Sequence, residues 1–153
     1  MELFLIRHAI AAAGDDDDDA RALTKKGQRR FDAVVRVLDG LGVRFDRVLH
    51  SPKLRAVQTA ARLHALVDGG FEVTELLAEP PSSELLAAFG EGRVALVGHE
   101  PHLSSLLSWL VAGSPTAARV ELKKGAVACL EGRPRPGAMT LRWLLPPRAG
   151  RAC

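Results

Sequence analysis

Residues 2–9 read Glu2-Leu3-Phe4-Leu5-Ile6-Arg7-His8-Ala9, a short apolar run that ends in two polar side chains. Large apolar residues with β-branched and aromatic members, as at 3–6, are typical of a buried strand in the middle of a parallel sheet. Open α/β sheets bind their ligands in the crevice beyond the carboxyl ends of such strands. Arg7 and His8 therefore form either part of a binding site or a solvated strand terminus, and other residues have to distinguish the two.

The size and composition of the chain are those of an ordinary globular protein. Its 153 residues are 47% hydrophobic and 25% charged, which predicts one domain over residues 1–153. The net charge of +3 includes no long basic block, so we do not expect a nucleic-acid partner. Cys129 and Cys153 have neither metal-ligand spacing nor the pattern of a disulfide framework.

The sequence predicts neither export nor a membrane partner. The apolar run at 3–6 is too short for the hydrophobic region of a secretory signal, and Arg7 follows it directly. No stretch approaches the roughly 20 apolar residues that are needed to span a bilayer. We therefore expect a cytoplasmic protein.

Alternating strand and helix patterns predict the fold class. Strands are expected at 2–6, 45–50, 71–76, 94–97, 126–130 and 138–145, and helices after Thr24, Ser51, Ser82 or Ser83, and at Pro101. This order predicts an α/β fold, a three-layer α/β/α sandwich with a mainly parallel central sheet. At least one strand is expected to be antiparallel, and the last two are expected to form a C-terminal β-hairpin.

Two of the expected helices have clear starting signals. Thr24 is expected to cap a helix whose apolar stripe comprises Phe31, Val34, Val35 and Leu38. Ser51 is expected to cap the next helix, with Pro52 at its first position, and this helix is expected to continue to about Val67.

Five consecutive carboxylates, Asp15 to Asp19, come soon after the first strand. Like charges in a row repel one another and disfavour regular structure, so we expect a mobile surface loop. A metal site is the alternative interpretation. Repeated Asp without accompanying Glu, His or spaced Gly is not typical of such sites, and we expect no metal.

Three strand ends carry polar residues that could meet in one crevice: Arg7-His8, His50-Ser51 and Gly98-His99. Arg55 lies in the first turn of the helix after the second of these strands, where free N–H groups and the helix dipole favour an anion. His99 precedes another helix start. Two arginines and two histidines in one place predict a site for a tetrahedral dianion such as phosphate.

These motifs, taken in order, resemble those of the histidine phosphatase superfamily, and the nearest branch is that of the short SixA-type phosphohistidine phosphatases. The resemblance rests on the following segments: Arg7-His8, Arg21-Ala22-Leu23-Thr24-x-x-Gly27, Ser51-Pro52-x-x-Arg55-Ala56-x-Gln58-Thr59, Gly98-His99-Glu100-Pro101 and Leu122-Lys123-Lys124-Gly125. Ala9 replaces a glycine common in the superfamily, and Ala22 stands where the short branch often has proline. Neither departure removes a catalytic group.

The resemblance implies a role for each residue of the predicted site. His8 would attack phosphorus as a neutral imidazole and form a covalent phosphohistidine. Arg7 and Arg55 would bind the equatorial oxygens, and His99 would complete this clamp by donating a hydrogen bond. Neither a metal nor another cofactor is expected, because the arginines supply the positive charge. Arg21 either guides the anionic substrate or is a solvated charge.

Glu79 is the candidate general acid, since larger members of the superfamily carry a carboxylic acid in this region. An alkoxide leaving group requires a proton donor, whereas an imidazole can leave once its ring is protonated. Four roles therefore remain open for Glu79. It is the general acid, a residue that assists proton transfer, a structural cap or a carboxylate in a solvated loop.

The resemblance implies a phosphatase of signal transduction that acts on phosphohistidine. The partner expected is a histidine-phosphorylated protein domain, because short connections between strands and helices predict an open pocket. Two alternatives remain: a phosphatase for small phosphomonoesters such as sugar phosphates or nucleotides, and a phosphate- or phosphoprotein-binding module without catalysis.

Overall fold

The computed structural model describes residues 1–14 and 17–152. Its strands are β1 (Glu2–Arg7), β2 (Arg47–His50), β3 (Phe71–Val73), β4 (Arg93–Gly98), β5 (Val127–Gly132) and β6 (Met139–Leu145). They form a single sheet in the order β3-β2-β4-β1-β5-β6. The first four strands in this order run parallel, and β5 and β6 join as an antiparallel hairpin. The predicted sheet, mainly parallel with a C-terminal hairpin, is confirmed.

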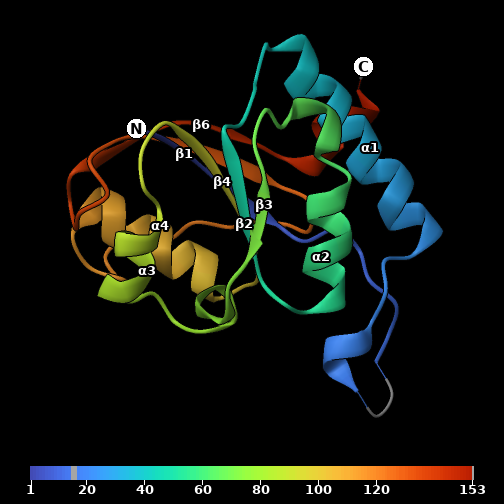
Figure 1. The fold of residues 1–153 in the computed structure, drawn as a ribbon, viewed down its shortest axis with the longest axis horizontal. Helices are drawn as coiled ribbons and strands as arrows, with labels where there is room; N and C mark the ends of the chain where they lie inside the picture. Colours follow the sequence, from blue (N-terminus) through green and yellow to red (C-terminus); the bar gives the residue numbers. More distant parts are fainter. Residues whose placement is uncertain (15–16, 153) are drawn as a thin grey trace.

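Helices cover both faces of the sheet (Figure 1). The longer ones are α1 (Lys25–Gly40), α2 (Leu54–Ala61), α3 (Ser83–Ala88) and α4 (His102–Ala112). One core cluster joins the sheet to apolar residues of α1 and α2, and another joins it to those of α3 and α4. Each face of the sheet thus has its own apolar core and its own layer of helices. This is the three-layer sandwich that the sequence predicted.

Strand β1 is the centre of this arrangement, paired with β4 on one side and β5 on the other. Successive side chains of a strand point to opposite faces, so Leu3 and Leu5 pack in the α3–α4 layer while Phe4 and Ile6 pack in the α1–α2 layer. All four are buried. Burial of an apolar side chain of this size contributes about 1.5–3 kcal/mol, which explains why the four buried positions of the strand are all apolar.

The parallel strands bring their carboxyl ends to one edge of the sheet. Arg7 at the end of β1 is in register with Gly98 of β4, and His50 at the end of β2 is in register with Val97. The antiparallel β5 begins at this same edge, because its Val127 pairs with Ile6. The segment before β5 therefore also reaches the edge, where the Gly125 N–H donates to the carbonyls of Arg7 and His8.

Several local predictions are confirmed and others are wrong. Thr24 caps α1 by accepting the N–H of Gly27 at 2.9 Å, and Ser82 caps α3. Ser51 does not cap α2, which begins at Leu54 after Lys53; the Ser51 hydroxyl bonds to the ring of His99 and accepts the N–H of Lys53. The helix also ends at Ala61, before the predicted Val67, and a separate 3-10 turn follows it.

Two of the predicted strands are shorter than expected. β2 starts at Arg47 although Phe45 makes one isolated bridge, and β3 ends at Val73, before the 3-10 turn Glu75–Ala78. In the described part of the chain, no helix combines the length and the apolar character needed to cross a bilayer.

Candidate active site

His8 lies just beyond the end of β1, and one of its ring nitrogens is held by the main chain. His8 Nδ1 lies 2.7 Å from the carbonyl oxygen of Ala9. A carbonyl oxygen only accepts hydrogen bonds, so Nδ1 carries the ring proton. In the neutral ring, the lone pair is then on Nε2. The side chain is only 5% exposed, and its main-chain N–H donates to Gly98 of the neighbouring strand β4.

Arg7 and Arg55 are fixed in the same manner, each through a main-chain carbonyl. Arg7 Nη1 donates to the carbonyl of Leu122 at 2.9 Å, and Arg55 Nη1 donates to the carbonyl of Asp18 at 2.8 Å. The Nε atoms of both arginines are buried and have no hydrogen-bond partner among the described residues. Buried donors without a partner are costly, which points to an acceptor that binds there.

His99 follows β4 and lies next to His8, with a ring-centroid separation of 5.2 Å and an inclination of 50°. Its Nε2 is 2.7 Å from the hydroxyl oxygen of Ser51. That hydroxyl also accepts the main-chain N–H of Lys53 at 3.2 Å. The other ring nitrogen, Nδ1, is a third buried polar atom that has no partner in the described part of the chain.

The hydroxyl of Thr59 connects two parts of the site. It accepts the N–H of Ala9 at 3.0 Å and donates to the carbonyl of Arg55 at 2.7 Å. One fully buried side chain thus ties the residue after the nucleophile candidate to the helix that carries Arg55. Thr59 was part of the motif in the sequence, but no sequence signal identified this bridging role.

Burial and positive charge keep both histidines unprotonated at neutral pH. Burial lowers the pKa of His8 to about 4, against the hydrogen bond to Ala9, and Arg55, Arg7 and Lys124 add to the lowering. The pKa of His99 is lowered to about 3, first by burial and then by the charges of His8 and Arg55. Both shifts have the causes expected of imidazoles buried among cations.

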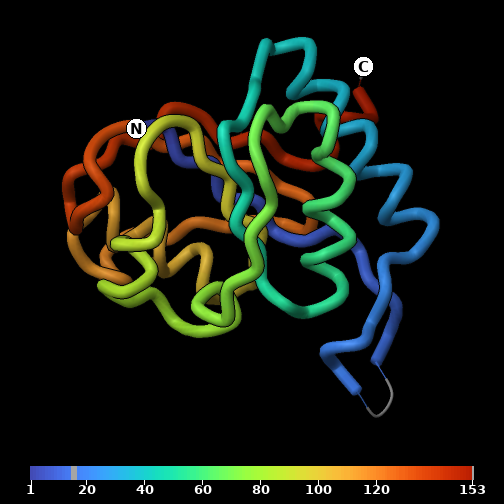
Figure 2. Tube along the Cα trace, in the orientation of Figure 1, coloured from blue at the N-terminus to red at the C-terminus, as the bar shows by residue number. Residues whose placement is uncertain are grey.

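Asp17 to Asp19 are exposed, as the sequence predicted, but they form a 3-10 turn in place of the expected irregular loop, and Asp15 and Asp16 lie outside the described residues. Asp17 caps the 3-10 turn Asp18–Ala20. Asp18 reaches Arg55, with Arg55 Nη2 donating to Oδ2 at 3.1 Å. The contacts to Arg55 outweigh like-charge repulsion, so this stretch folds onto the start of α2. Figure 2 shows the connection between β1 and α1 passing beside that end of α2.

The remaining sequence candidates lie further out. Arg21 donates to the carboxylate of Asp18 and to the carbonyl of Ala12. It is therefore linked to Arg55 through their shared partner Asp18. Glu79 is exposed directly after the turn Glu75–Ala78, and no described residue forms a hydrogen bond or ion pair with its side chain. Leu77 in that turn packs against the end of β4, since its carbonyl lies 3.4 Å from where a Gly98 Cβ would be.

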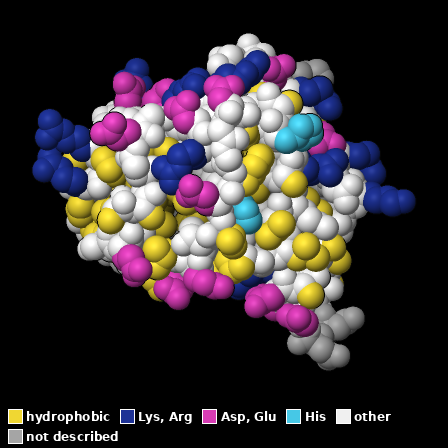
Figure 3. All heavy atoms as spheres, in the orientation of Figure 1, with side chains coloured by type: hydrophobic (Ala, Val, Ile, Leu, Met, Phe, Trp, Pro, Cys, Tyr) yellow, Lys and Arg dark blue, Asp and Glu magenta, His cyan; other side chains and the backbone are white. Residues whose placement is uncertain are grey.

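No metal cluster is formed by His, Cys, Asp or Glu within residues 1–14 and 17–152. On the face seen in Figure 3, acidic side chains follow the lower border of the molecule.

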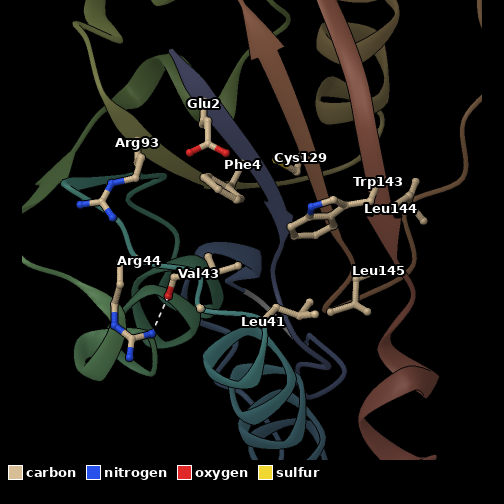
Figure 4. A pocket seen from close by; sticks show the side chains of 11 residues that line it. Glu2, Phe4, Leu41, Val43, Arg44, Arg93, Cys129, Trp143, Leu144 and Leu145 are labelled. Atoms are coloured by element: carbon tan, nitrogen blue, oxygen red, sulfur yellow. Dashed lines mark hydrogen bonds between the residues drawn. The ribbon is translucent and has the colours of Figure 1, made fainter.

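A separate cavity of about 550 Å³ lies near the starts of β1 and β4. Phe4 and Trp143 form its inner wall, and Arg44 and Arg93 lie at its side (Figure 4). Asp39 already pairs with Arg44, while Asp46 and Asp68 pair with Arg93. None of the candidate catalytic residues lines this cavity.

Comparison with known proteins places the sequence among phosphatases. Residues 3–80 match the histidine phosphatase superfamily (branch 1). The chain is 36% identical over 166 residues to an uncharacterized protein of Picosynechococcus sp., covering 95% of this chain and all of that protein. It is also 36% identical over 86 residues to the phosphohistidine phosphatase SixA of Escherichia coli, covering 56% of this chain and 47% of that protein.

Solved structures agree with the sequence comparison. The structure of the protein histidine phosphatase SixA complexed with tungstate matches with a TM-score of 0.82 and 28% identity, over 97% of this chain and 99% of that one. A phosphoserine phosphatase of Entamoeba histolytica in complex with 3-phosphoglyceric acid matches with a TM-score of 0.69 and 18% identity, over 94% and 96% of the two chains. The latter likeness concerns the fold alone.

Proposed function

The chain belongs to the SixA-type branch of the histidine phosphatase superfamily, and from this we propose that it removes phosphate from phosphohistidine carried by a protein. Its membership of this superfamily of hydrolases supports phosphatase activity in general. The observation that carries the catalytic proposal is the position of His8. Its Nδ1 is held as a donor by Ala9, and it lies beside two arginines whose Nε atoms have no partner in the described chain.

In the first step, the lone pair on His8 Nε2 attacks phosphorus. The new N–P bond forms on His8 while the N–P bond to the substrate imidazole breaks, and that imidazole leaves with the bonding electron pair. A neutral ring is required for the attack, and the lowered pKa of His8 supplies it at neutral pH. The Ala9 carbonyl holds the ring proton on Nδ1, which keeps the nucleophilic nitrogen unprotonated.

The two arginines and His99 hold the transferring group. Each guanidinium has one Nη committed to a protein carbonyl, which leaves its buried Nε for a phosphoryl oxygen. We assign the Ser51 hydroxyl proton to the bond with His99 Nε2, because this nitrogen is the one acceptor bonded to that hydroxyl among the described residues. His99 Nδ1 then carries the ring proton and donates it toward the phosphoryl group.

In the second step, water attacks the phosphohistidine on His8 and the N–P bond breaks. Phosphate leaves, the ring of His8 recovers its lone pair, and the proton lost by water balances the one taken up by the departed imidazole. Glu79 is proposed as the group that assists these proton transfers. An imidazole leaving group places a weaker demand on such an acid than an alkoxide does.

A protein-borne substrate fits the short connections at the site. Only residues 51–53 separate β2 from α2, and only 99–101 separate β4 from α4, so neither connection contains a domain-sized insertion over His8. In the longer connection between β1 and α1, Asp18 contacts Arg55 of α2. The likeness at 28% identity to a solved protein histidine phosphatase supports the same substrate class.

A substrate panel and a trapping experiment test the proposal together. The panel comprises a phosphohistidine-bearing protein domain, a phosphohistidine peptide, a sugar phosphate and a nucleotide. We expect the highest kcat/KM with phosphohistidine, and acid-labile, alkali-stable phosphate on the wild-type chain but not on His8→Ala. A higher kcat/KM for a small ester would assign the chain to phosphomonoesters. Phosphate binding without turnover of any substrate would leave only a binding module.

A further inference from the structure

We propose that Asp18 is a positioning residue for Arg55: it holds one edge of the guanidinium so that the opposite edge is presented to the phosphoryl group. The role of Arg55 in this inference rests on the proposed function. The inference itself rests on the contacts of Asp18, a residue outside every motif that identified the family.

Asp18 binds Arg55 through two of its own oxygen atoms. Arg55 Nη1 donates to the main-chain carbonyl at 2.8 Å, and Nη2 donates to the carboxylate Oδ2 at 3.1 Å. The side chain of Arg55 is 6% exposed, whereas that of Asp18 is 60% exposed. The guanidinium is thus the buried, fixed member of the pair, and the 3-10 turn brings Asp18 to it from the surface.

A guanidinium has five N–H groups in a planar fork, and they divide into two useful edges. Asp18 occupies the edge formed by the two Nη atoms. The other edge, formed by Nε and the second hydrogen of Nη2, is not used by Asp18, and Nε has no partner in the described chain. Arg7 shows the same division, with Nη1 bonded to Leu122 and Nε without a partner. The two arginines therefore keep equivalent edges for one ligand.

Other contacts hold Asp18 in this position. Arg21 Nε donates to the carboxylate Oδ1 at 2.9 Å, so the two carboxylate oxygens bind different arginines. Lys53 Nζ lies 3.6 Å from Oδ2. Arg55 above all, with Arg21, lowers the pKa of the Asp18 carboxyl and keeps it ionised at neutral pH. Arg21, predicted to bind substrate, would instead act through Asp18.

The competing explanation is that Asp18 imitates the phosphate and has to be displaced by the substrate. An internal competitor would be expected at the buried edge that contains Nε, and Asp18 is not bonded there. The two explanations also predict opposite signs. Removal of a competitor strengthens anion binding, whereas removal of a positioning residue weakens it, because the guanidinium then samples other orientations.

The variants Asp18→Ala, Asp18→Asn and Asp19→Asn separate these explanations. Asp19 is the matched control, since its carboxylate is 71% exposed on the same turn and contacts Lys53 at 3.7 Å but not Arg55. For Asp18→Ala, we expect affinity for inorganic phosphate or tungstate, measured by calorimetry, to fall by about tenfold, with a similar fall in kcat/KM. Asp18→Asn keeps an acceptor oxygen and should recover part of the loss, and Asp19→Asn should stay within about twofold.

A double-mutant cycle with Arg55→Lys tests whether Asp18 acts through Arg55. In the Arg55→Lys background, Asp18→Ala should have little further effect on anion affinity, because the fork that Asp18 orients is absent. Tighter anion binding by Asp18→Ala, or a full additive loss in the Arg55→Lys background, would overturn the proposal. Anion affinity does not depend on the identity of the substrate, so this result stands apart from that of the substrate panel.

Discussion

The rings of His8 and His99 lie 5.2 Å apart, and each is tied to the protein through one nitrogen while the other is left for chemistry. His8 is held through Nδ1 by the Ala9 carbonyl, and His99 through Nε2 by the Ser51 hydroxyl. The two arrangements are complementary. One ring keeps a lone pair for attack, and the other keeps a ring nitrogen that can donate a hydrogen bond to the group under attack.

The first prediction concerns the pH dependence of activity. Protonated His8 cannot attack phosphorus, and its pKa is about 4 in the free protein. The value of kcat/KM should therefore rise with pH through an apparent pKa near 4 and be level above about pH 5.5. Because the two histidines interact, this apparent pKa belongs to the pair. Initial rates between pH 3.5 and 8 at constant ionic strength measure it. A limb at the ordinary histidine pKa of about 6.5 would contradict the prediction if it stayed at the same pH for substrates whose own pKa values differ.

The same pKa shifts predict a dependence of stability on pH. Below about pH 6.5, the unfolded chain takes up protons on His8 and His99, whereas the folded chain does so only near pH 4 and pH 3. The unfolded state thus binds more protons in this window, and the free energy of unfolding should decrease as pH falls from 6.5 toward 4. Urea unfolding at several pH values checks the sign. His8→Asn should reduce the slope.

Ser51→Ala tests the orientation of His99. Loss of the hydroxyl leaves His99 Nε2 without its hydrogen-bond partner, so the ring proton can then occupy either nitrogen. We expect kcat/KM to fall by about tenfold, the effect of one hydrogen bond of about 1.4 kcal/mol. Ser83→Ala is the control, because Ser83 is exposed at the start of α3 and its hydroxyl forms no hydrogen bond with any described residue. An unchanged kcat/KM would remove Ser51 from the catalytic arrangement.

Much of this site could be predicted from the sequence because its parts are local patterns. The apolar strand before Arg7, and the helix that begins shortly before Arg55, are each visible within about ten residues. Parallel pairing then places the strand ends together. The contacts of Ser51 with His99 and of Asp18 with Arg55 join residues far apart in the chain. A serine before proline is typical of a helix cap, and a run of aspartates is typical of a solvated loop, so local reasoning missed both contacts.

Glu79→Gln distinguishes the roles left open for this carboxylate. If Glu79 supplies a proton to the leaving group, the decrease in kcat caused by Glu79→Gln should depend on the chemistry of the leaving group. We expect kcat for a phosphomonoester to fall by about 100-fold or more, in the range of general acid catalysis, and kcat for phosphohistidine to fall much less. Glu75→Gln, on the same surface turn, is the control. Equal small effects on both substrates would assign Glu79 to a solvated loop.

Gly27→Ala tests how closely α1 has to approach the chain that leaves the active site. Alanine normally favours a helix over glycine by about 1 kcal/mol. At Gly27, however, a Cβ atom would lie 2.2 Å from the carbonyl oxygen of Ile10, which also accepts the N–H of Thr24. Relief of this contact requires movement of main chain close to His8.

We therefore expect Gly27→Ala to lower the free energy of unfolding by about 1–3 kcal/mol, the usual cost of overpacking, and to lower kcat/KM as well. Gly40→Ala is the matched control at the other end of α1, where a Cβ would meet nothing within 4 Å. It should leave kcat/KM unchanged and raise stability by up to about 1 kcal/mol. Urea unfolding and initial rates on the same samples measure both effects. A stabilised, fully active Gly27→Ala would show that the main chain at Ile10 moves without cost, contrary to the close packing inferred for this part of the site.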